Sequence, residues 1–228
     1  SGGFQFNIEF VGSINIIDNF STPEDQPFGL SLDSNDNLIS SDRGINKIYI
    51  HDGISSTITS SFNAPSSSPQ GITVDSNDNL ISINNTTDPG TIYIHDGISS
   101  TTTSSFNAPI SNPSVLTIDS NGNLISGGFD GSNHKIYIHQ GTSSTTTNNF
   151  DSPGSNLEGI TVDPNGNLIS STDPGTIYVH DGISATITNS FSSPGNFPKG
   201  LAIDPNGDLI VVDQDNNGNR KFFVIELV

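Results

Sequence analysis

The sequence contains no Cys, no Trp and no Met, and only six of its 228 residues are Lys or Arg. Without Cys, the chain has no disulfide framework and no thiolate nucleophile. No apolar run approaches the roughly 18 residues that a membrane-spanning helix requires, which argues against membrane insertion. No segment shows the apolar periodicity of an amphipathic helix. An all-β fold is the class that remains.

Basic residues are scarce beside 24 Asp and Glu, so the formal net charge is -18. A surface of this sign repels phosphate backbones, and nucleic acid is therefore excluded as an expected partner. Anionic membrane surfaces are disfavoured for the same reason. The abundance of Ser, Thr and Asn and the low Lys content favour an exported protein. We therefore predict an extracellular or cell-surface location.

Apolar residues make up only 31% of the chain, which would fill one large core poorly. A repeat array needs less, because each unit buries only the faces it shares with its neighbours. Two markers repeat with one period of 41 to 44 residues. The first is an Asp that follows a short apolar run, at Asp33, Asp75, Asp119, Asp163 and Asp204. The second is a Phe that ends a Ser/Thr-rich run, at Phe20, Phe62, Phe106, Phe150 and Phe191.

Each repeat contains four short runs of β-branched or aromatic residues, separated by Asp, Asn, Gly and Pro. In the second repeat they lie at about residues 71–75, 79–83, 91–95 and 101–106. Runs of this kind predict strands, and the Asp-x-Asn-Gly/Asp-Asn segments suit short hairpin turns. A four-stranded unit of about 40 residues is typical of a β-propeller blade. The prediction is an all-β, five-bladed β-propeller of four-stranded antiparallel blades, with six blades as the alternative.

The two ends of the sequence predict how the ring closes. The last repeat supplies Leu201–Ile203, Leu209–Val212 and Phe222–Glu226, but no Ser/Thr-rich fourth run. Residues 13–20 have the pattern of that missing strand, so we expect them to complete the last blade. The propeller domain is then residues 13–228. Residues 1–12 hold one extra alternating segment, Phe4–Phe10, which we expect to pair with an outer edge or with another molecule.

The repeated pattern Gly-Ile-Thr-Val-Asp, Ser-Asn-Gly-Asn, Leu-Ile-Ser and Lys-Ile-Tyr-Ile-His-Asp-Gly resembles the NHL-repeat propellers over about residues 20–228. The resemblance implies a propeller used for binding or scaffolding. More distant six-bladed relatives include hydrolases with a metal in the central channel. The sequence departs from the family in having five units. It also departs in its second strand, where only Val211-Val212-Asp213 keeps the usual Val-Ala-Asp form.

The residue before the first-strand Gly differs in every repeat, although the frame around it is constant. We expect these positions to face the axial entrance and to form a ligand-binding site; neutral drift at an exposed position is the alternative. The five residues are Phe28, Gln70, Ser114, Glu158 and Lys199. A Glu158–Lys199 pair across the axis has the chemistry for acid–base catalysis, or for a plain ion pair.

Oxygen-rich loops raise the possibility of a metal. Asp213, Asp215 and Asn217 form the best candidate calcium site, although they lack the spacing of an EF-hand loop and a turn explains them equally well. No other cofactor is expected. His51, His95, His139 and His180 recur at one position of the third strand. Strands lie about 4.8 Å apart, so these four His residues are too far from the axis to share one metal, and local turn bonds are expected instead.

These features favour a non-catalytic binding or assembly module of a secreted or surface protein. Its expected partners are a protein, or a second copy held through Phe4–Phe10. One alternative is a carbohydrate-binding propeller, for which the four Tyr of the third strands are the only repeated aromatic platforms. A second alternative is a metal-dependent hydrolase or lyase at the channel mouth, using Glu158 and loop Asp residues. The sequence has no Gly-x-Ser-x-Gly elbow, which weakens the case for an enzyme without deciding it.

Overall fold

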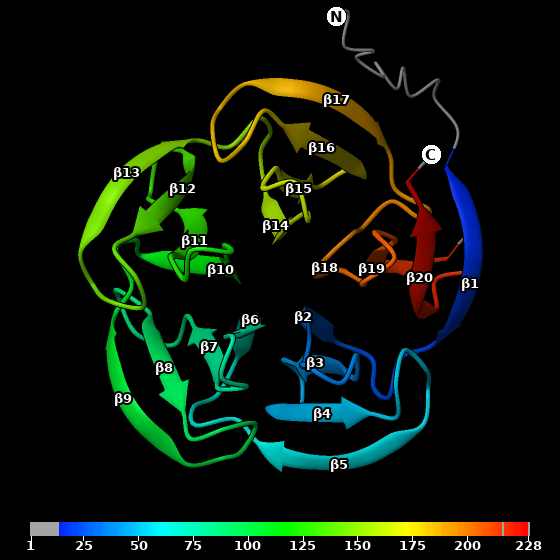
Figure 1. Cartoon of the computed structure of the whole chain (residues 1–228), viewed down its shortest axis with the longest axis horizontal. Coiled ribbons are helices and arrows are strands. Elements are labelled where there is room, and N and C mark those ends of the chain that lie inside the picture. Colours follow the sequence, from blue (N-terminus) through cyan, green and yellow to red (C-terminus); the bar gives the residue numbers. More distant parts are fainter. Residues whose placement is uncertain (1–13, 216, 228) are drawn as a thin grey trace, which may run out of the picture.

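The computed structural model describes residues 14–215 and 217–227, and these residues form twenty strands in five four-stranded antiparallel sheets. The sheets are blades arranged around a central axis (Figure 1). The prediction of a five-bladed β-propeller is confirmed, and the six-bladed alternative is wrong. Within these two ranges no helix has the length and apolar character needed to cross a membrane.

Each blade has the same order of strands from the axis outward. The innermost strands are β2 (Pro27–Leu32), β6 (Pro69–Val74), β10 (Asn112–Ile118), β14 (Leu157–Val162) and β18 (Leu201–Ile203). The second strands are β3 (Leu38–Asp42), β7 (Leu80–Asn84), β11 (Leu124–Phe129), β15 (Leu168–Thr172) and β19 (Leu209–Gln214).

The outer half of each blade contains the Tyr-bearing and Ser/Thr-rich strands. The third strands are β4 (Lys47–His51), β8 (Thr91–His95), β12 (His134–His139), β16 (Thr176–His180) and β20 (Arg220–Glu226). The outermost strands are β5 (Ile58–Asn63), β9 (Thr102–Asn107), β13 (Thr146–Asp151), β17 (Ile187–Ser192) and β1 (Asn15–Ser21). These outermost strands are largely exposed, which explains their Ser and Thr content.

Strand β1 closes the ring, because it is the fourth strand of a blade whose other three strands come from the C-terminal end of the chain. Phe20 of β1 pairs with Phe222 of β20, and the two ring centroids lie 5.2 Å apart. The predicted closing strand is therefore confirmed, with bounds shifted by one or two residues. The predicted strand Phe4–Phe10 lies outside the described residues.

The core is divided into five clusters that lie between adjacent blades. In one of them, Ile39 and Ile48 of the first blade pack with Ile72 and Leu80 of the second. Another joins the last blade to the first and includes Leu30, Leu38 and Phe222. Each blade buries both of its faces against its neighbours, so a modest apolar content is sufficient. This arrangement confirms the expectation from composition.

The Gly of the innermost strand lets adjacent blades approach closely. A Cβ added at Gly29 would lie 2.6 Å from the carbonyl oxygen of Gln70 and 2.7 Å from the amide nitrogen of Ile72. The third repeat has Val115 at this position instead. In the other four repeats the Gly allows the innermost strands of neighbouring blades to pack closely.

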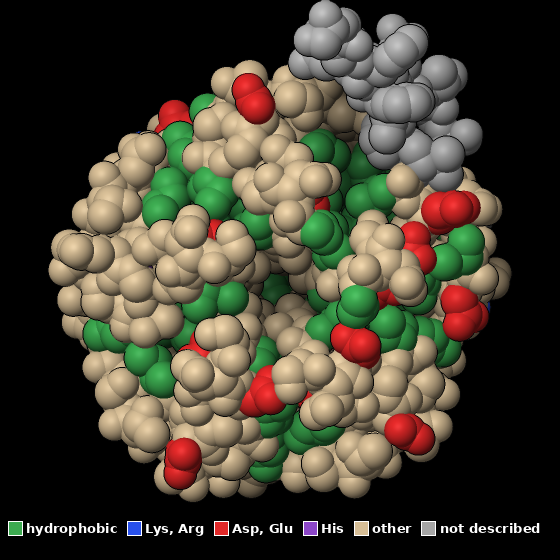
Figure 2. All heavy atoms as spheres, viewed as in Figure 1, with side chains coloured by type: hydrophobic (Ala, Val, Ile, Leu, Met, Phe, Trp, Pro, Cys, Tyr) green, Lys and Arg blue, Asp and Glu red, His purple; other side chains and the backbone are tan. Residues whose placement is uncertain are grey.

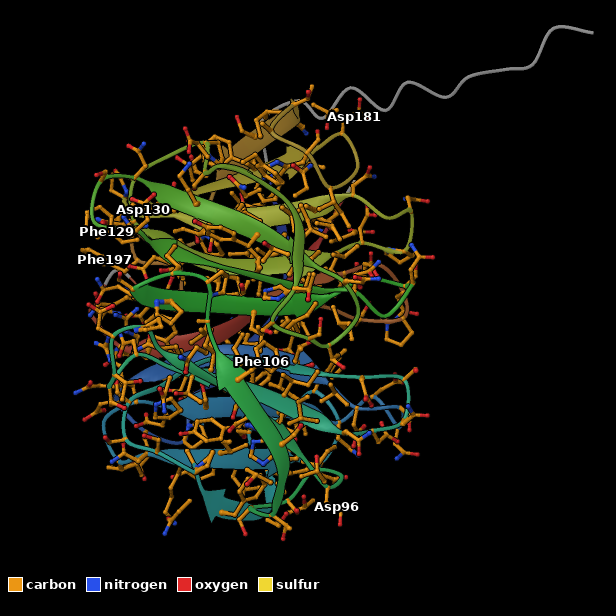
Figure 3. The ribbon with its side chains drawn as sticks, turned by 90° about the vertical axis from the view of Figure 1, so that its left-hand side faces the viewer. Asp96, Phe106, Phe129, Asp130, Asp181 and Phe197 are labelled. Atoms are coloured by element: carbon orange, nitrogen blue, oxygen red, sulfur yellow. The ribbon has the colours of Figure 1, made fainter. Side chains whose placement is uncertain are left out.

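The alternating strand directions give the propeller two different ends. Innermost strands begin at the end that we call the Phe28 end, where the loops between second and third strands also lie. They finish at the Asp-turn end, which has the turns that start at Asp33, Asp75, Asp119, Asp163 and Asp204. Figure 3 shows Asp130 and Phe197 at one end, with Asp96 and Asp181 toward the other.

Candidate binding site at the axial mouth

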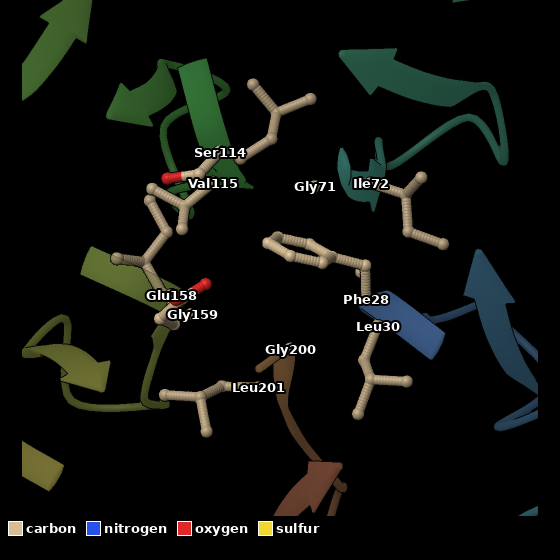
Figure 4. Close-up of a pocket in the computed structure, with 13 residues that line it drawn as sticks. Phe28, Leu30, Gly71, Ile72, Ser114, Val115, Glu158, Gly159, Gly200 and Leu201 are labelled. Atoms are coloured by element: carbon tan, nitrogen blue, oxygen red, sulfur yellow. The ribbon is translucent and has the colours of Figure 1, made fainter. Parts of the chain in front are cut away.

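Three of the five predicted axial residues line the channel mouth at the Phe28 end. Phe28, Ser114 and Glu158 surround it together with the innermost-strand Gly residues and their apolar neighbours. Figure 4 shows the Phe28 ring projecting toward the middle of this mouth. The cavity has a volume of about 10 Å³, which is about enough for one water molecule. The cavity is therefore too small to enclose a small-molecule ligand.

The Phe28 ring lies close to two cations. The Arg43 guanidinium carbon is 5.4 Å from the ring centroid, and the Lys199 ammonium nitrogen is 5.6 Å from it. Cations at these distances are attracted to the negative face of an aromatic ring. Phe28 itself is only 5% exposed. An apolar ring between two positive groups is thus fixed at the centre of this end of the molecule.

Glu158 and Lys199 form an ion pair beside the ring. The Lys199 ammonium nitrogen lies 2.7 Å from a Glu158 carboxylate oxygen, and both side chains are mostly buried. Burial raises the pKa of the Glu158 carboxyl above its ordinary value, and the Lys199 ammonium opposes that rise. The two residues do form the predicted pair, but they come from adjacent blades and not from opposite sides of the axis. A catalytic use of the pair stays a prediction.

The polar residues Gln70 and Ser114 make hydrogen bonds within the propeller itself. Gln70 is 1% exposed and does not line the cavity; its amide donates a hydrogen bond to the Ser68 hydroxyl over 3.1 Å. The Ser114 hydroxyl donates to the Leu157 carbonyl over 2.8 Å, which joins the third blade to the fourth. Hydrogen bonds within the propeller therefore account for the polar side chains at two of the five predicted positions.

Asp213, one of the predicted calcium ligands, is fully buried and surrounded by hydrogen-bond donors. Its carboxylate accepts hydrogen bonds from the Ser193 hydroxyl and from the amides of Gly195, Phe197 and Gln214. These donors fix the loop before β18 against the end of β19. The carboxylate oxygens are thus engaged by the protein itself.

Asp215 serves a separate turn. Its carboxylate accepts hydrogen bonds from the amides of Asn217 and Asn219, each over 2.9 Å, and lies 3.6 Å from the Lys221 ammonium. In residues 14–215 and 217–227, no three His, Asp or Glu side chains gather in a way that could hold a metal ion. Hydrogen bonds to nearby backbone amides give Asp213 and Asp215 a structural role. Calcium binding stays a prediction.

The four repeated His residues take part in buried hydrogen bonds with Ser. The Nδ1 of His51 donates to the Ser55 carbonyl over 2.7 Å, so its Nε2 accepts from the Ser40 hydroxyl over 3.0 Å. The same Ser–His contact occurs at 2.8 to 2.9 Å in the next three blades. The predicted local turn bond is confirmed, but the Ser partner was missed. These pairs are 0 to 2% exposed, which leaves no access for a substrate.

The four Tyr residues do not form exposed platforms. Tyr49 is buried, and Tyr93, Tyr137 and Tyr178 are half-buried within the third strands. The Tyr49 hydroxyl donates to Glu24 over 3.3 Å, and burial together with Glu24 raises its pKa to about 12. Sugar rings usually stack on accessible aromatic faces, so this arrangement gives the carbohydrate alternative no support.

The channel mouth at the Asp-turn end is wider, and the sequence reasoning missed it. Two adjoining cavities of about 360 and 290 Å³ lie there, and they share Leu32, Ile118 and Ser120. The residue before each repeated Asp lines one or both cavities, and it is aliphatic in every blade. That regularity is visible in the sequence, where it marks the end of the first apolar run of each repeat.

No family model and no curated protein matches this chain, so the resemblance to NHL-repeat propellers is not confirmed. Solved propeller structures do match. The glutaminyl cyclase of Myxococcus xanthus has a TM-score of 0.74 and 12% identity over 93% of this chain and 95% of its own. The WD40 propeller domain of Doa1 has a TM-score of 0.59 and 15% identity over 87% and 63% of the two chains.

A chain of the Mitotic Checkpoint Complex has a TM-score of 0.55 and 18% identity, covering 86% of this chain and 60% of its own. These two matches thus span about three fifths of the Mitotic Checkpoint Complex chain and of the Doa1 chain. At these identities the likeness shows the propeller fold alone.

Proposed function

We propose that this chain is a non-catalytic binding module of a secreted or cell-surface protein, and that its Phe28 end docks on a protein partner. The observation that carries the proposal is the group formed by Phe28, Arg43 and the Glu158–Lys199 ion pair at a mouth of about 10 Å³. A mouth this small cannot enclose a small molecule, because drug-sized ligands occupy pockets of about 300 Å³ or more. A protein surface needs no such pocket.

The chemistry of the mouth suits a partner that presents an acidic or polar tip. Arg43 and Lys199 are two of only six Lys and Arg residues in a chain of net charge -18, and both lie beside Phe28. Aromatic and Arg side chains near the centre of an interface commonly contribute most of its binding energy. A similar propeller chain belongs to the Mitotic Checkpoint Complex, and use of this fold within a protein assembly is consistent with the proposal.

Selection of peptides from a random displayed library on the immobilised protein tests this function. We expect enriched peptides that contain Asp, Glu or a free carboxylate and that lose at least about tenfold in affinity for Phe28→Ala and Arg43→Gln variants. The matched control is Asp181→Asn at the opposite end, which should bind the same peptides unchanged. Failure to enrich any peptide, or equal binding to all variants, would refute the proposal.

A second candidate function is acid–base catalysis by Glu158. The raised pKa of its buried carboxyl favours it, because a general acid works best with a pKa closer to the working pH. One similar structure is a glutaminyl cyclase, which makes release of ammonia from a peptide with N-terminal Gln a direct assay. Turnover by the wild-type chain that is lost in Glu158→Gln would favour this enzyme over a binding module.

Self-association through Phe4–Phe10 stays a separate proposal. Removal of residues 1–12 would abolish it without touching the propeller. Sedimentation of the full chain and of the shortened chain at equal concentration shows whether these residues are needed for self-association. A shift from dimer to monomer supports the proposal, and identical monomers contradict it.

A further inference from the structure

Carboxylates lie at both ends of the propeller, but the cations lie at only one of them. All six Lys and Arg residues lie at the Phe28 end, in loops before β18 and after β3 or near the starts of β4, β12 and β20. Twelve carboxylates lie at the Asp-turn end, in the turns after first and third strands and at the end of β20. They are Asp33, Asp36, Asp52, Asp75, Asp78, Asp96, Asp119, Asp163, Asp181, Asp204, Asp208 and Glu226.

Figure 2 views the Asp-turn end and shows carboxylates spread around a central hollow, with blue confined to slivers at the rim. A high net charge by itself accounts for solubility, but it does not require every cation to be at one end. The uncompensated carboxylates repel one another. Burial and the charges of Asp204 and Glu226 raise the pKa of Asp208, which is a sign of that repulsion.

The hollow at this end has an aliphatic wall. The last residue of each innermost strand points to it and is half-buried: Leu32, Val74, Ile118, Val162 and Ile203. The Asp that follows each of them is held in place by its own turn. Asp33, for example, accepts hydrogen bonds from the amides of Asn35 and Asn37. The result is an aliphatic ring inside a rigid ring of carboxylates.

A Lys or Arg side chain fits both rings. Its aliphatic stem can lie against the Leu, Val and Ile residues while its charged head reaches the carboxylates. The carboxylates extend well beyond the hollow, because Asp52, Asp96 and Asp181 follow third strands. Those strands lie two strand spacings, or about 10 Å, farther from the axis than the innermost strands. A small cation in the hollow would leave these outer charges unmatched, whereas a basic protein segment would span them.

We propose that the Asp-turn end is a docking surface for a basic protein segment that inserts a Lys or Arg side chain into the aliphatic-walled hollow. This surface is at the opposite end of the axis from the Phe28 mouth, and it does not depend on the function proposed for that mouth.

Fluorescence anisotropy with two labelled peptides tests the proposal. One peptide repeats Lys-Gly-Ser-Gly, and the other has diaminobutyric acid in place of Lys, which has the same charge on a shorter aliphatic stem. The test variant replaces four exposed carboxylates of the Asp-turn end: Asp36→Asn, Asp52→Asn, Asp96→Asn and Asp181→Asn. The matched control removes four exposed carboxylates from the Phe28 end: Glu24→Gln, Asp25→Asn, Asp88→Asn and Asp151→Asn. A third variant, Val74→Thr with Val162→Thr, changes the wall and no charge.

We expect the Lys-containing peptide to bind the wild-type chain more tightly than the diaminobutyric acid peptide, because only the longer stem covers the aliphatic wall. Its affinity should fall about tenfold in the test variant and less than twofold in the control, since each exposed charge contributes a few tenths of a kcal/mol. The wall variant should also weaken it. Equal losses in test and control variants would mean attraction to net charge alone and would overturn the proposal. Absence of binding, or displacement by spermine at equal affinity, would overturn it as well.

Discussion

In the last blade, two apolar residues occupy the places of the buried Ser and His of the other four. Val211 stands where Ser40, Ser82, Ser126 and Ser170 stand, and Ile225 stands where the four His residues do. Both partners change together, and the two replacement residues are fully buried. A buried hydrogen-bonded pair and an apolar pair of similar shape can be nearly equivalent in stability, whereas a broken pair cannot. The Ser–His pairs therefore have a structural role.

This equivalence can be tested in the second blade. His95→Ile alone leaves the Ser82 hydroxyl and the Ser99 carbonyl without their partner, and we expect it to lower the free energy of unfolding by about 1–3 kcal/mol. Adding Ser82→Val should recover a substantial part of that loss, because the double variant copies the last blade. Urea denaturation of the single and double variants measures both effects. Strictly additive losses would contradict the interpretation.

The four repeated His residues also predict a pH dependence of stability. Burial lowers the pKa of each of them below the ordinary value of 6.5. Well above pH 6.5 these His residues are neutral in both the folded and the unfolded chain, so they do not make the free energy of unfolding depend on pH. As the pH falls below 6.5, the unfolded chain binds protons that the folded chain excludes, so the free energy of unfolding decreases. The slope is at most about 1.4 kcal/mol per pH unit for each His.

Denaturant unfolding measured between pH 7 and pH 5 checks this prediction. The variant with Ser82→Val and His95→Ile has one buried His fewer, so its pH slope should be smaller than that of the wild-type chain by the contribution of one His. The contributions of Glu158, whose pKa is raised, and of His134, whose pKa is lowered by burial, are common to both proteins and cancel in the difference between the two slopes. Equal slopes would show that the buried His residues do not cause the dependence.

Among the elements, the innermost strands are the most constrained by their neighbours. Gly29→Ala would place a methyl group against the backbone of β6, and we expect overpacking to cost about 1–3 kcal/mol. The control is Gly53→Ala, where the added atom meets open space and only the positive φ of 62° opposes it. Thermal unfolding should therefore show a larger decrease in melting temperature for Gly29→Ala. The reverse order would contradict the packing argument.

The closing strand β1 differs from the other outermost strands because no short loop connects it to its own blade. We expect Phe20→Ala to detach β1 locally, because the Phe20 ring packs on Phe222, which is fully buried. Phe106→Ala in β9 is the matched control, because β9 follows β8 in the chain. Hydrogen exchange should speed up for the amides that pair β1 with β20 in the first variant only. If the amides that pair β1 with β20 stay equally protected in both variants, β1 does not open independently of the rest of its blade.

The sequence predicted the elements well and the site in part, and the reason is physical. Strands, turns and ring closure follow from local patterns that repeat five times, so Asp33 and Phe20 marked them independently of any tertiary contact. The role of Gln70 depends on how closely the neighbouring blade approaches, and the burial of Asp213 depends on the loop at Gly195. Such contacts join residues of different segments, and no local pattern records them.

For the whole molecule, the ring creates two mouths from one repeated unit. The Phe28 mouth includes three residues that differ between repeats, Phe28, Ser114 and Glu158, and it has a cavity of only about 10 Å³. The opposite mouth is built from the residues that the repeats share, and its cavities are much larger. A five-fold frame thus presents an asymmetric, partly cationic surface at one end and an acidic, nearly regular one at the other.

The central claim is that the Phe28 mouth is a binding surface. Chemical-shift mapping of backbone amides, with a peptide selected on the wild-type chain, tests it most directly. We predict that the largest shifts fall on residues 27–29, 43–44, 114–116, 158–160 and 199–201, and that they disappear in Phe28→Ala. Shifts confined to the outermost strands or to the Asp-turn end, with the residues around Phe28 unaffected, would contradict the claim.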